Sequence, residues 1–262
     1  MTQLTSLNIL SHRDTSTASD LLPEPKIDTS SEFGLKVSTT VMDWDISASY
    51  FYGYDGLPTQ QALVITPLDT LGTVALDLTM AYPRYHVLGA DFAGSLFDIG
   101  IWGEAAAFIP KSDFVFTQTM LTQMGEQVVG VDTLLEKGKP FVKFVLGGDY
   151  TFKNGLYVNT QFVHGFLHER GDSLHDYLVM RLEKKFLNDQ LKLAPVSFAA
   201  TVSDWDEPKE NYGLAWIPEI AYMPTDNIEL KVGAFVLDGK GENIFANLQD
   251  RDELFLRVKL TF

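Results

Sequence analysis

The sequence predicts an all-β protein, an antiparallel transmembrane β-barrel of about twelve strands, with about ten or fourteen strands as the other possibilities. Three observations predict this fold. Segments of about ten residues alternate between apolar and polar side chains, short and long connections follow one another along the chain, and the last segment ends on an aromatic residue. We expect residues 1–262 to form a single barrel domain.

The final segment, 252–262, shows the alternation most clearly. From Leu254 onward every even-numbered residue is apolar, whereas the odd-numbered residues include Arg257 and Lys259. Because successive side chains of a strand point to opposite faces, one face of this strand is apolar and the other is largely polar. The terminal Phe262 resembles the carboxy-terminal signal of bacterial outer-membrane barrels. Taken alone, the segment would equally suit the last strand of a soluble β-sandwich.

From Gly34 onward the chain contains eleven candidate strands. They are predicted at 34–42, 45–54, 82–94, 99–108, 141–152, 156–165, 176–187, 191–202, 212–224, 228–238 and 252–262. Bacterial barrels have an even number of strands, so we expect a further strand at 3–12.

The connections between these segments are alternately short and long. The short ones are predicted at Asp43-Trp44, Leu96 to Asp98, Lys153 to Gly155, Asn188-Asp189 and Thr225-Asp226. The third of these contains the pair Asn154-Gly155, and Asn-Gly between two alternating segments is a strong hairpin signal. Residues 55–71 are expected to be a loop, and 73–81 are ambiguous between loop and strand. Residues 109–139 are expected to be the longest loop, which either folds inward as a constriction or extends into solvent. Outer-membrane barrels sort their connections in this way, with short periplasmic turns and longer external loops.

The composition narrows the class of protein. The 35 acidic residues exceed the 20 basic ones, and the net charge of −15 argues against nucleic acid as a partner. No run approaches the ~18 apolar residues of a transmembrane helix, so a membrane would have to be crossed by strands. The absence of cysteine excludes a disulfide scaffold and a thiolate metal site. The first ten residues lack a basic region followed by an apolar core, so no secretory signal is recognised there.

Alternation assigns an inward face to each segment, and charged residues of both signs are predicted to line the pore there. The pore-lining prediction comprises Lys36, Asp45, Asp91, Glu104, Lys143, Asp149, Arg181, Glu183, Lys185, Glu219, Glu229, Lys231, Arg257 and Lys259. Acids and bases are equally represented, so we expect a nearly neutral, restricted interior.

The outward face is expected to carry few charges. Its main exceptions are Arg84 and Lys184, which we expect close to the membrane edges, where a cation costs least. The parity of Lys192 cannot be assigned. Aromatic residues at strand ends are expected to form two interfacial belts, namely Trp44, Tyr52, Tyr82, Phe97, Phe152, Tyr157, Phe186, Tyr222 and Phe262.

The sequence contains no recognisable catalytic residue, metal site or cofactor site. His164, His168 and His175 surround one loop, but their spacing on a strand end and loop is not that of a metal site. An esterase reading would need a serine beside His164, and no serine stands at a recognisable partner position. We therefore expect that the protein is not an enzyme.

Three stretches of the chain carry a family resemblance. They are 45–55, 82–92 together with Gly103-Glu104-Ala105, and 148–169, which includes the run Tyr157 to Phe166. These stretches are similar to a family of proteobacterial outer-membrane barrel proteins catalogued as a domain of unknown function. The resemblance implies a transport role, often proposed to accompany exporters of lipids or other hydrophobic compounds, and no catalytic residues. Members are usually longer, so it leaves open a complete barrel, a carboxy-terminal portion or half of a split barrel.

Together these observations predict an outer-membrane channel, or the outer-membrane component of a transport system, for passive passage of small or hydrophobic solutes. The alternative is a barrel anchor or translocator that presents its loops for binding and has no conducting pore. The expected partners are outer-membrane lipid and either a partner chain or the rest of a longer barrel. The predicted location is the bacterial outer membrane.

Overall fold

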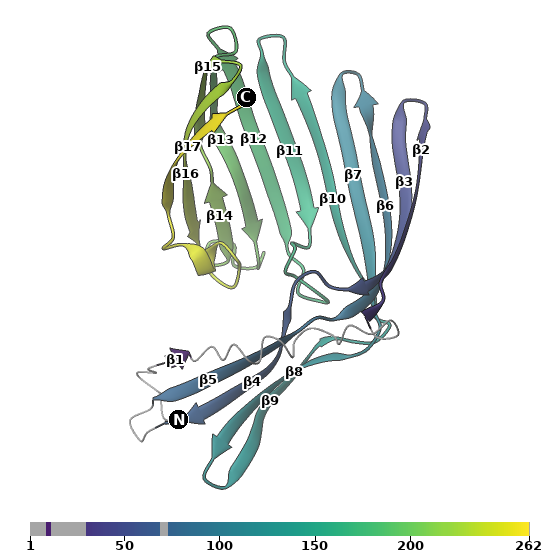
Figure 1. The fold of residues 1–262 in the computed structure, drawn as a ribbon, viewed down its shortest axis with the longest axis vertical. Helices are drawn as coiled ribbons and strands as arrows, with labels where there is room; N and C mark the ends of the chain where they lie inside the picture. The colour runs from purple at the N-terminus through teal and green to yellow at the C-terminus, as the bar shows by residue number, and fades with distance from the viewer. Residues whose placement is uncertain (1–8, 12–29, 69–72, 262) are drawn as a thin grey trace.

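A computed structural model describes residues 9–11, 30–68 and 73–261, which are mainly β-strands arranged in two sheets (Figure 1). The larger sheet is antiparallel and has twelve strands, and the smaller one has five. The helical element of the described residues is a short 3₁₀ turn, η1 (Ala246–Leu248). No helix in these ranges is long and apolar enough to cross a membrane.

All eleven strands predicted from Gly34 onward are present in the large sheet. From one edge to the other they are β2 (Phe33–Val41), β3 (Trp44–Tyr54), β6 (Arg84–Leu96), β7 (Ile99–Pro110), β10 (Phe141–Thr151), β11 (Leu156–His164), β12 (Asp176–Phe186), β13 (Leu191–Val202), β14 (Tyr212–Trp216) with β15 (Glu219–Thr225), β16 (Ile228–Gly239) and β17 (Glu253–Leu260).

The twelfth strand of this sheet arises from an interruption and not from an additional segment. The strand predicted at 212–224 is divided at Ile217-Pro218 into β14 and β15, and both halves pair with β13 and β16. Proline has no N–H to donate to a ladder, which explains the division.

The described part of the strand expected at 3–12 does not join the large sheet. Of its residues the structure describes 9–11, and these form β1 (Ile9–Ser11), which pairs in parallel with β5 of the small sheet. The rest of the expected strand lies outside the described residues. The placement of 9–11 in the large sheet was therefore wrong.

The small sheet corrects two loop predictions. Its order is β1, β5 (Val74–Ala81), β4 (Thr59–Pro67), β8 (Phe114–Thr122) and β9 (Gly125–Leu135), so the expected loops at 55–71 and 109–139 contain strands, and the ambiguous 73–81 is a strand. Figure 1 shows that this sheet extends away from the end of the large sheet opposite the short turns. Within 109–139, β8 and β9 therefore form a hairpin of the second sheet.

The short turns all lie at one end of the large sheet, at the top of Figure 1. The first is Met42-Asp43, one residue earlier than predicted, with φ of 50° and 66°, and Phe97-Asp98 has φ of 50° and 70°. Positive φ at both central residues defines the type I′ turn, whose twist matches that of the flanking strands. Because neighbouring strands of this sheet are antiparallel, the longer connections lie at the opposite end.

Two apolar clusters attach other segments to one face of the large sheet at that opposite end. Tyr85, Phe108 and Phe141 of the large sheet pack against Phe114 and Leu135 of the small sheet. The second cluster joins Tyr177 and Ala215 of the sheet with Phe166, Ile244 and Phe245, so the connections after β11 and β16 also fold onto this face.

The two edges of the large sheet remain open within the described residues. There β2 pairs with β3 alone, and β17 pairs with β16 alone. The structure thus shows a large antiparallel sheet, and the pairing that would close it into a barrel is not among the described contacts.

The first turn offers a test of the fold. Replacing Met42 with Asn should stabilise the protein by about 0.5–1 kcal/mol, because Asn tolerates the left-handed conformation that costs most other residues about 1–2 kcal/mol. The temperature of unfolding, read from the change in electrophoretic mobility on heating, should rise. Met124→Asn is the matched control, since Met124 is also an exposed turn methionine but is not among the described residues with positive φ. Equal shifts in both variants would contradict the explanation.

Candidate functional site

Strand register places all fourteen predicted pore-lining residues on one face of the large sheet. Residues directly opposite each other in neighbouring strands share a face. Asp149, for example, lies opposite Asn159, which lies opposite Arg181, and Glu229 and Lys231 lie opposite Lys259 and Arg257. We call this the polar face. That it lines a pore stays a prediction.

An ion-pair network crosses the polar face from β12 to β16. Arg181 contacts Glu219 at 2.8 Å and Glu183 at 3.2 Å. Lys231 lies 3.7 Å from both Glu219 and Glu229. Because each carboxylate is matched by a neighbouring cation, the network places charge on the sheet with little local imbalance.

Lys192, whose parity the sequence did not reveal, joins this network. Its Nζ atom lies 3.8 Å from Glu183. A register shift between Leu182 and Lys184 in the β12–β13 pairing moves the alternation of β13 by one residue along its length. A prediction that assumes a strict period of two cannot detect such an irregularity.

The remaining predicted residues are less closely associated. Lys36 pairs with Asp91 at 2.8 Å, Asp45 accepts a hydrogen bond from Thr40, and Asp149 accepts one from Tyr157 at 2.8 Å. Tyr157 is therefore on the polar face, and its assignment to an interfacial belt was wrong. Within the described ranges, no ion pair is formed by Glu104, Lys185, Arg257 or Lys259.

The opposite face, here the apolar face, leaves large hydrophobic side chains exposed on every part of the sheet. Leu254 is 82% exposed, Leu256 72%, and Val37 at the other edge 65%. Between the edges, the exposed side chains include Leu88, Phe92, Val142, Leu146, Phe162, Leu178, Ile220 and Val232. Soluble monomers rarely expose a continuous apolar surface of more than a few hundred Å².

The two cations predicted on this face lie at strand ends, as expected. Arg84 begins β6, and its guanidinium lies over the rings of Tyr52 and Tyr54 at 4.2 and 4.8 Å. Lys184 lies near the opposite end, with its Nζ 5.5 Å from the ring centre of Phe186.

A cavity of about 880 Å³ lies at the long-connection end of the sheet. Its wall is formed by β9, the connection 165–175 between β11 and β12, and the connection that contains η1. The lining is rich in polar groups and includes Asp132, His168, Glu169, Arg170, Asp172, His175, Glu242 and Asn243.

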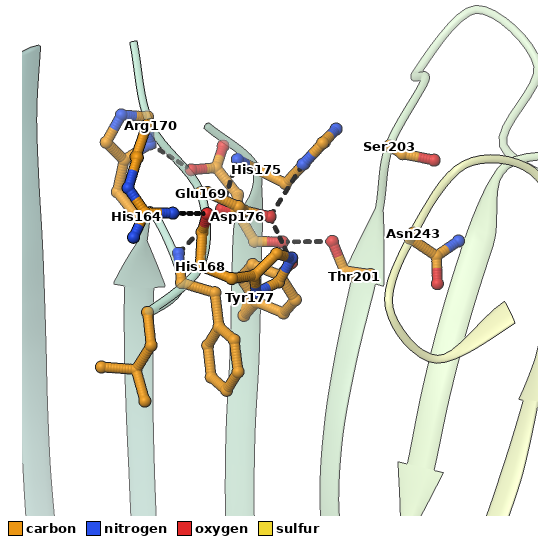
Figure 2. A network of polar contacts seen from close by, with 12 residues as sticks. His164, His168, Glu169, Arg170, His175, Asp176, Tyr177, Thr201, Ser203 and Asn243 are labelled. Atoms are coloured by element: carbon orange, nitrogen blue, oxygen red, sulfur yellow. Dashed lines mark hydrogen bonds and ion pairs between the residues drawn. The ribbon is translucent and has the colours of Figure 1, made fainter. Parts of the chain in front are cut away.

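Glu169 organises the connection 165–175, as Figure 2 shows. Its side chain is nearly buried, and its carboxylate accepts hydrogen bonds from the Tyr177 hydroxyl, the His175 ring at 2.9 Å, and the backbone N–H groups of Phe166 at 2.7 Å and His175 at 3.1 Å. Burial by itself raises the pKa of Glu169, but the hydrogen bonds from Tyr177, His175 and Phe166 outweigh it and hold the pKa below its ordinary value.

Two cations attach the same connection to the rest of the molecule. Arg170 donates to Asp55 at 2.8 Å and to the Leu57 carbonyl at 3.0 Å, just before the small sheet begins. Lys143 of β10 donates to the Phe166 carbonyl at 2.8 Å. The connection is thus fixed both to the wall of the large sheet and to the base of the small one.

Asn243 holds the third side of the cavity. It is 5% exposed, donates to the carbonyls of Tyr212 and Lys240, and accepts from the N–H groups of Phe245 and Ala246. The sequence does not reveal Glu169 and Asn243, because most of their partners lie within their own irregular connections, where no periodic pattern marks the contacts. Their position beside Gly165 and Gly241, both with positive φ, is a weak signal of ordered loops.

The three histidines do not converge. His164 pairs with Asp176 at 2.7 Å, His175 pairs with Glu169, and His168 lies on the cavity wall. In the part of the chain that the structure describes, no group of three or more potential metal-ligating side chains is found. The arrangement holds loops in place and can offer polar contacts to a ligand in the cavity.

No family model, curated protein or solved structure matches this chain.

Replacement of Glu169 by Gln tests the role of its carboxylate. One acceptor oxygen is replaced by an NH₂ group facing donors, so the local stability of 165–175 should fall by about 1–3 kcal/mol. Hydrogen exchange of the backbone amides of 165–175 should accelerate accordingly. Glu242→Gln is the control, because Glu242 lines the same cavity but is exposed. Unchanged exchange in the Glu169 variant would refute this role.

Acid should loosen the same connection in two steps. Burial lowers the pKa of His168 from 6.5, against the neighbouring Glu169 carboxylate, which raises it. A depressed histidine pKa stabilises the folded connection above about pH 6.5, and that contribution is lost as the pH falls below this value. The depressed pKa of Glu169 gives a contribution that is present above 4.5 and lost as the pH falls through the folded pKa.

Hydrogen exchange, corrected for its intrinsic pH dependence, should therefore show protection of 165–175 that falls first below about pH 6.5 and again as the pH decreases below 4.5. The upper step should disappear in His168→Gln and the lower one in Glu169→Gln. A flat profile across this range would contradict the assignment.

Proposed function

We propose that this chain forms the wall of an outer-membrane transport barrel, with the apolar face toward lipid and the polar face toward the transport path. The observation that carries this proposal is the exposed apolar face, since water cannot favourably wet so much hydrophobic surface. The unbroken strands of the large sheet contain 8 to 13 residues, and a tilted transmembrane strand needs about 9–11.

The ends of the strands support the same orientation. Trp44, Phe152, Phe186 and Tyr222 lie near the short turns, where aromatic rings would meet one headgroup layer. Tyr52 lies near the other end, together with Arg84. Both cations of the apolar face are thereby kept away from the middle of the hydrocarbon, where each would cost about 2–4 kcal/mol.

The polar face supports passage of small polar or amphipathic solutes along the wall. Ion pairs such as Arg181–Glu219 fill part of the space and would restrict it. The proposed role is therefore a narrow or gated channel, or the outer-membrane component of a transport system.

A second candidate function follows from the small sheet and the cavity. Aromatic residues of both clusters and the connection 165–175 cover one end of the polar face, and a sheet of five strands extends beyond them. These features favour an anchor that presents binding segments outside the membrane and does not conduct.

Purified protein in planar bilayers separates the two functions. The transport proposal predicts discrete conductance steps, and a membrane-inserted but silent protein supports the anchor. Without Arg181 the network keeps Glu183 and Glu219 but loses a cation between them, so Arg181→Gln should shift selectivity toward cations. Lys184→Gln, which removes a cation from the apolar face, should leave selectivity unchanged. If the protein stays monodisperse without detergent, both proposed functions are refuted.

A further inference from the structure

The paired strands β13 and β14–β15 contain an unusual interruption. Pro195 lies in β13 and Pro218 between β14 and β15, and the ladder pairs 191–194 with 219–222 and then resumes at 198 with 216. Proline is normally confined to edge strands or bulges, because it cannot donate to a ladder. Here two prolines lie at the same level of adjacent interior strands.

The structure repairs this interruption with bonds of its own. Ile217 N–H donates to the Ser197 carbonyl at 2.6 Å, and Ala234 N–H donates to the Pro218 carbonyl at 3.2 Å. The indole N–H of Trp216 donates to the Pro195 carbonyl at 2.9 Å. Because backbone groups are satisfied in this way, the interruption is a stable feature of the wall.

A groove of about 340 Å³ lies at this interruption, and its lining is almost wholly apolar. Leu193, Ile220, Val232 and Leu254 line it, and register places all four on the apolar face. An enclosed apolar cavity of about 150 Å³ suffices for benzene. The groove thus has room for a run of several carbon atoms.

We propose that this groove is a binding site for one hydrocarbon chain of a lipid or fatty acid. This inference rests on the proposed function, since it requires the apolar face to meet hydrocarbon. A hydrocarbon chain is chosen over a polar ligand for two reasons. Glu219 borders the groove, but it belongs to the polar face, where it pairs with Arg181 and Lys231. The surface around the groove continues the same apolar face.

Trp216 supplies a reporter for occupancy. It is 42% exposed, lies on the apolar face opposite Phe198 and Val236, and is bonded to Pro195 of the groove. A brominated chain in the groove should quench its fluorescence. The experiment uses Trp44→Phe, Trp102→Phe and Trp205→Phe together, which leaves Trp216 as the only tryptophan.

The test is a titration of the detergent-purified chain with 9,10-dibromostearate at a fixed detergent concentration. The proposal predicts saturable quenching that unbrominated stearate reverses. Ala234→Phe should weaken binding by about tenfold or more, because each methylene kept out of an apolar site changes the equilibrium roughly fourfold. Ala90→Phe is the matched control, since Ala90 is exposed on the apolar face opposite Ala48 and Ala105, far from the groove in strand order.

Each result decides the proposal. Quenching that rises linearly with the ratio of fatty acid to detergent, or that Ala234→Phe leaves unchanged, shows only partition into the micelle and overturns the site. If the three-tryptophan variant does not fold, the unmodified chain and its Ala234→Phe and Ala90→Phe variants are compared by native mass spectrometry for retained stearate, with the same expected order. Solubility without detergent would remove the proposed function, whereas loss of saturable binding alone would remove only the groove.

Discussion

The division of the large sheet into one charged and one apolar face is the constraint on which the rest of the structure depends. A period of two runs from β2 to β17 and is interrupted by two register shifts in the described pairings. The shift in the β12–β13 pairing lies beside the proline interruption, and the shift in the β15–β16 pairing lies between Tyr222 and Thr225, beside Pro224. The polar face can satisfy its charges internally, as Arg181 does with Glu183 and Glu219. The side chains of the apolar face have no such partners, because they are exposed and no other segment of the described chain covers them. Its stability therefore depends on what lies outside the chain.

The same constraint explains why the polar loops and the cavity lie at one end. Connections between strands carry unpaired backbone groups and must reach water or be satisfied by side chains. At the short-turn end, the turns Met42-Asp43 and Phe97-Asp98 solve this with two residues in the type I′ conformation. At the other end Glu169, Asn243 and Arg170 provide the missing partners, and the small sheet pairs the backbone of the two longest connections. Order at that end thus comes from specific side chains and extra strands.

The sequence predicts the large sheet well because each strand carries its own signal. Alternation places Arg181 and Glu219 on one face without knowledge of the fold. The small sheet was not predicted, because β4, β8 and β9 lie in segments that were interpreted as loops and β5 lies in a segment that was ambiguous. In addition, the parallel pairing of β4 with β8 joins residues that are far apart in sequence. Glu169 could not be identified either, since its burial depends on Tyr177 and on backbone groups across the loop. Side chains whose partners lie in an irregular connection leave no periodic pattern in the sequence.

The directions of the edge strands constrain how the wall is completed. Ten antiparallel steps separate β2 from β17 when β14 and β15 count as one, so the two edges run in the same direction. Direct closure would make one parallel pair, which is only slightly less stable per residue than an antiparallel one. Antiparallel closure requires an odd number of added strands. In hydrocarbon each unpaired backbone group costs several kcal/mol, so neither edge can face lipid unpaired along its length. If the apolar face meets lipid, a partner for β2 and β17 is therefore a physical requirement, whether each edge pairs with the other or with further strands.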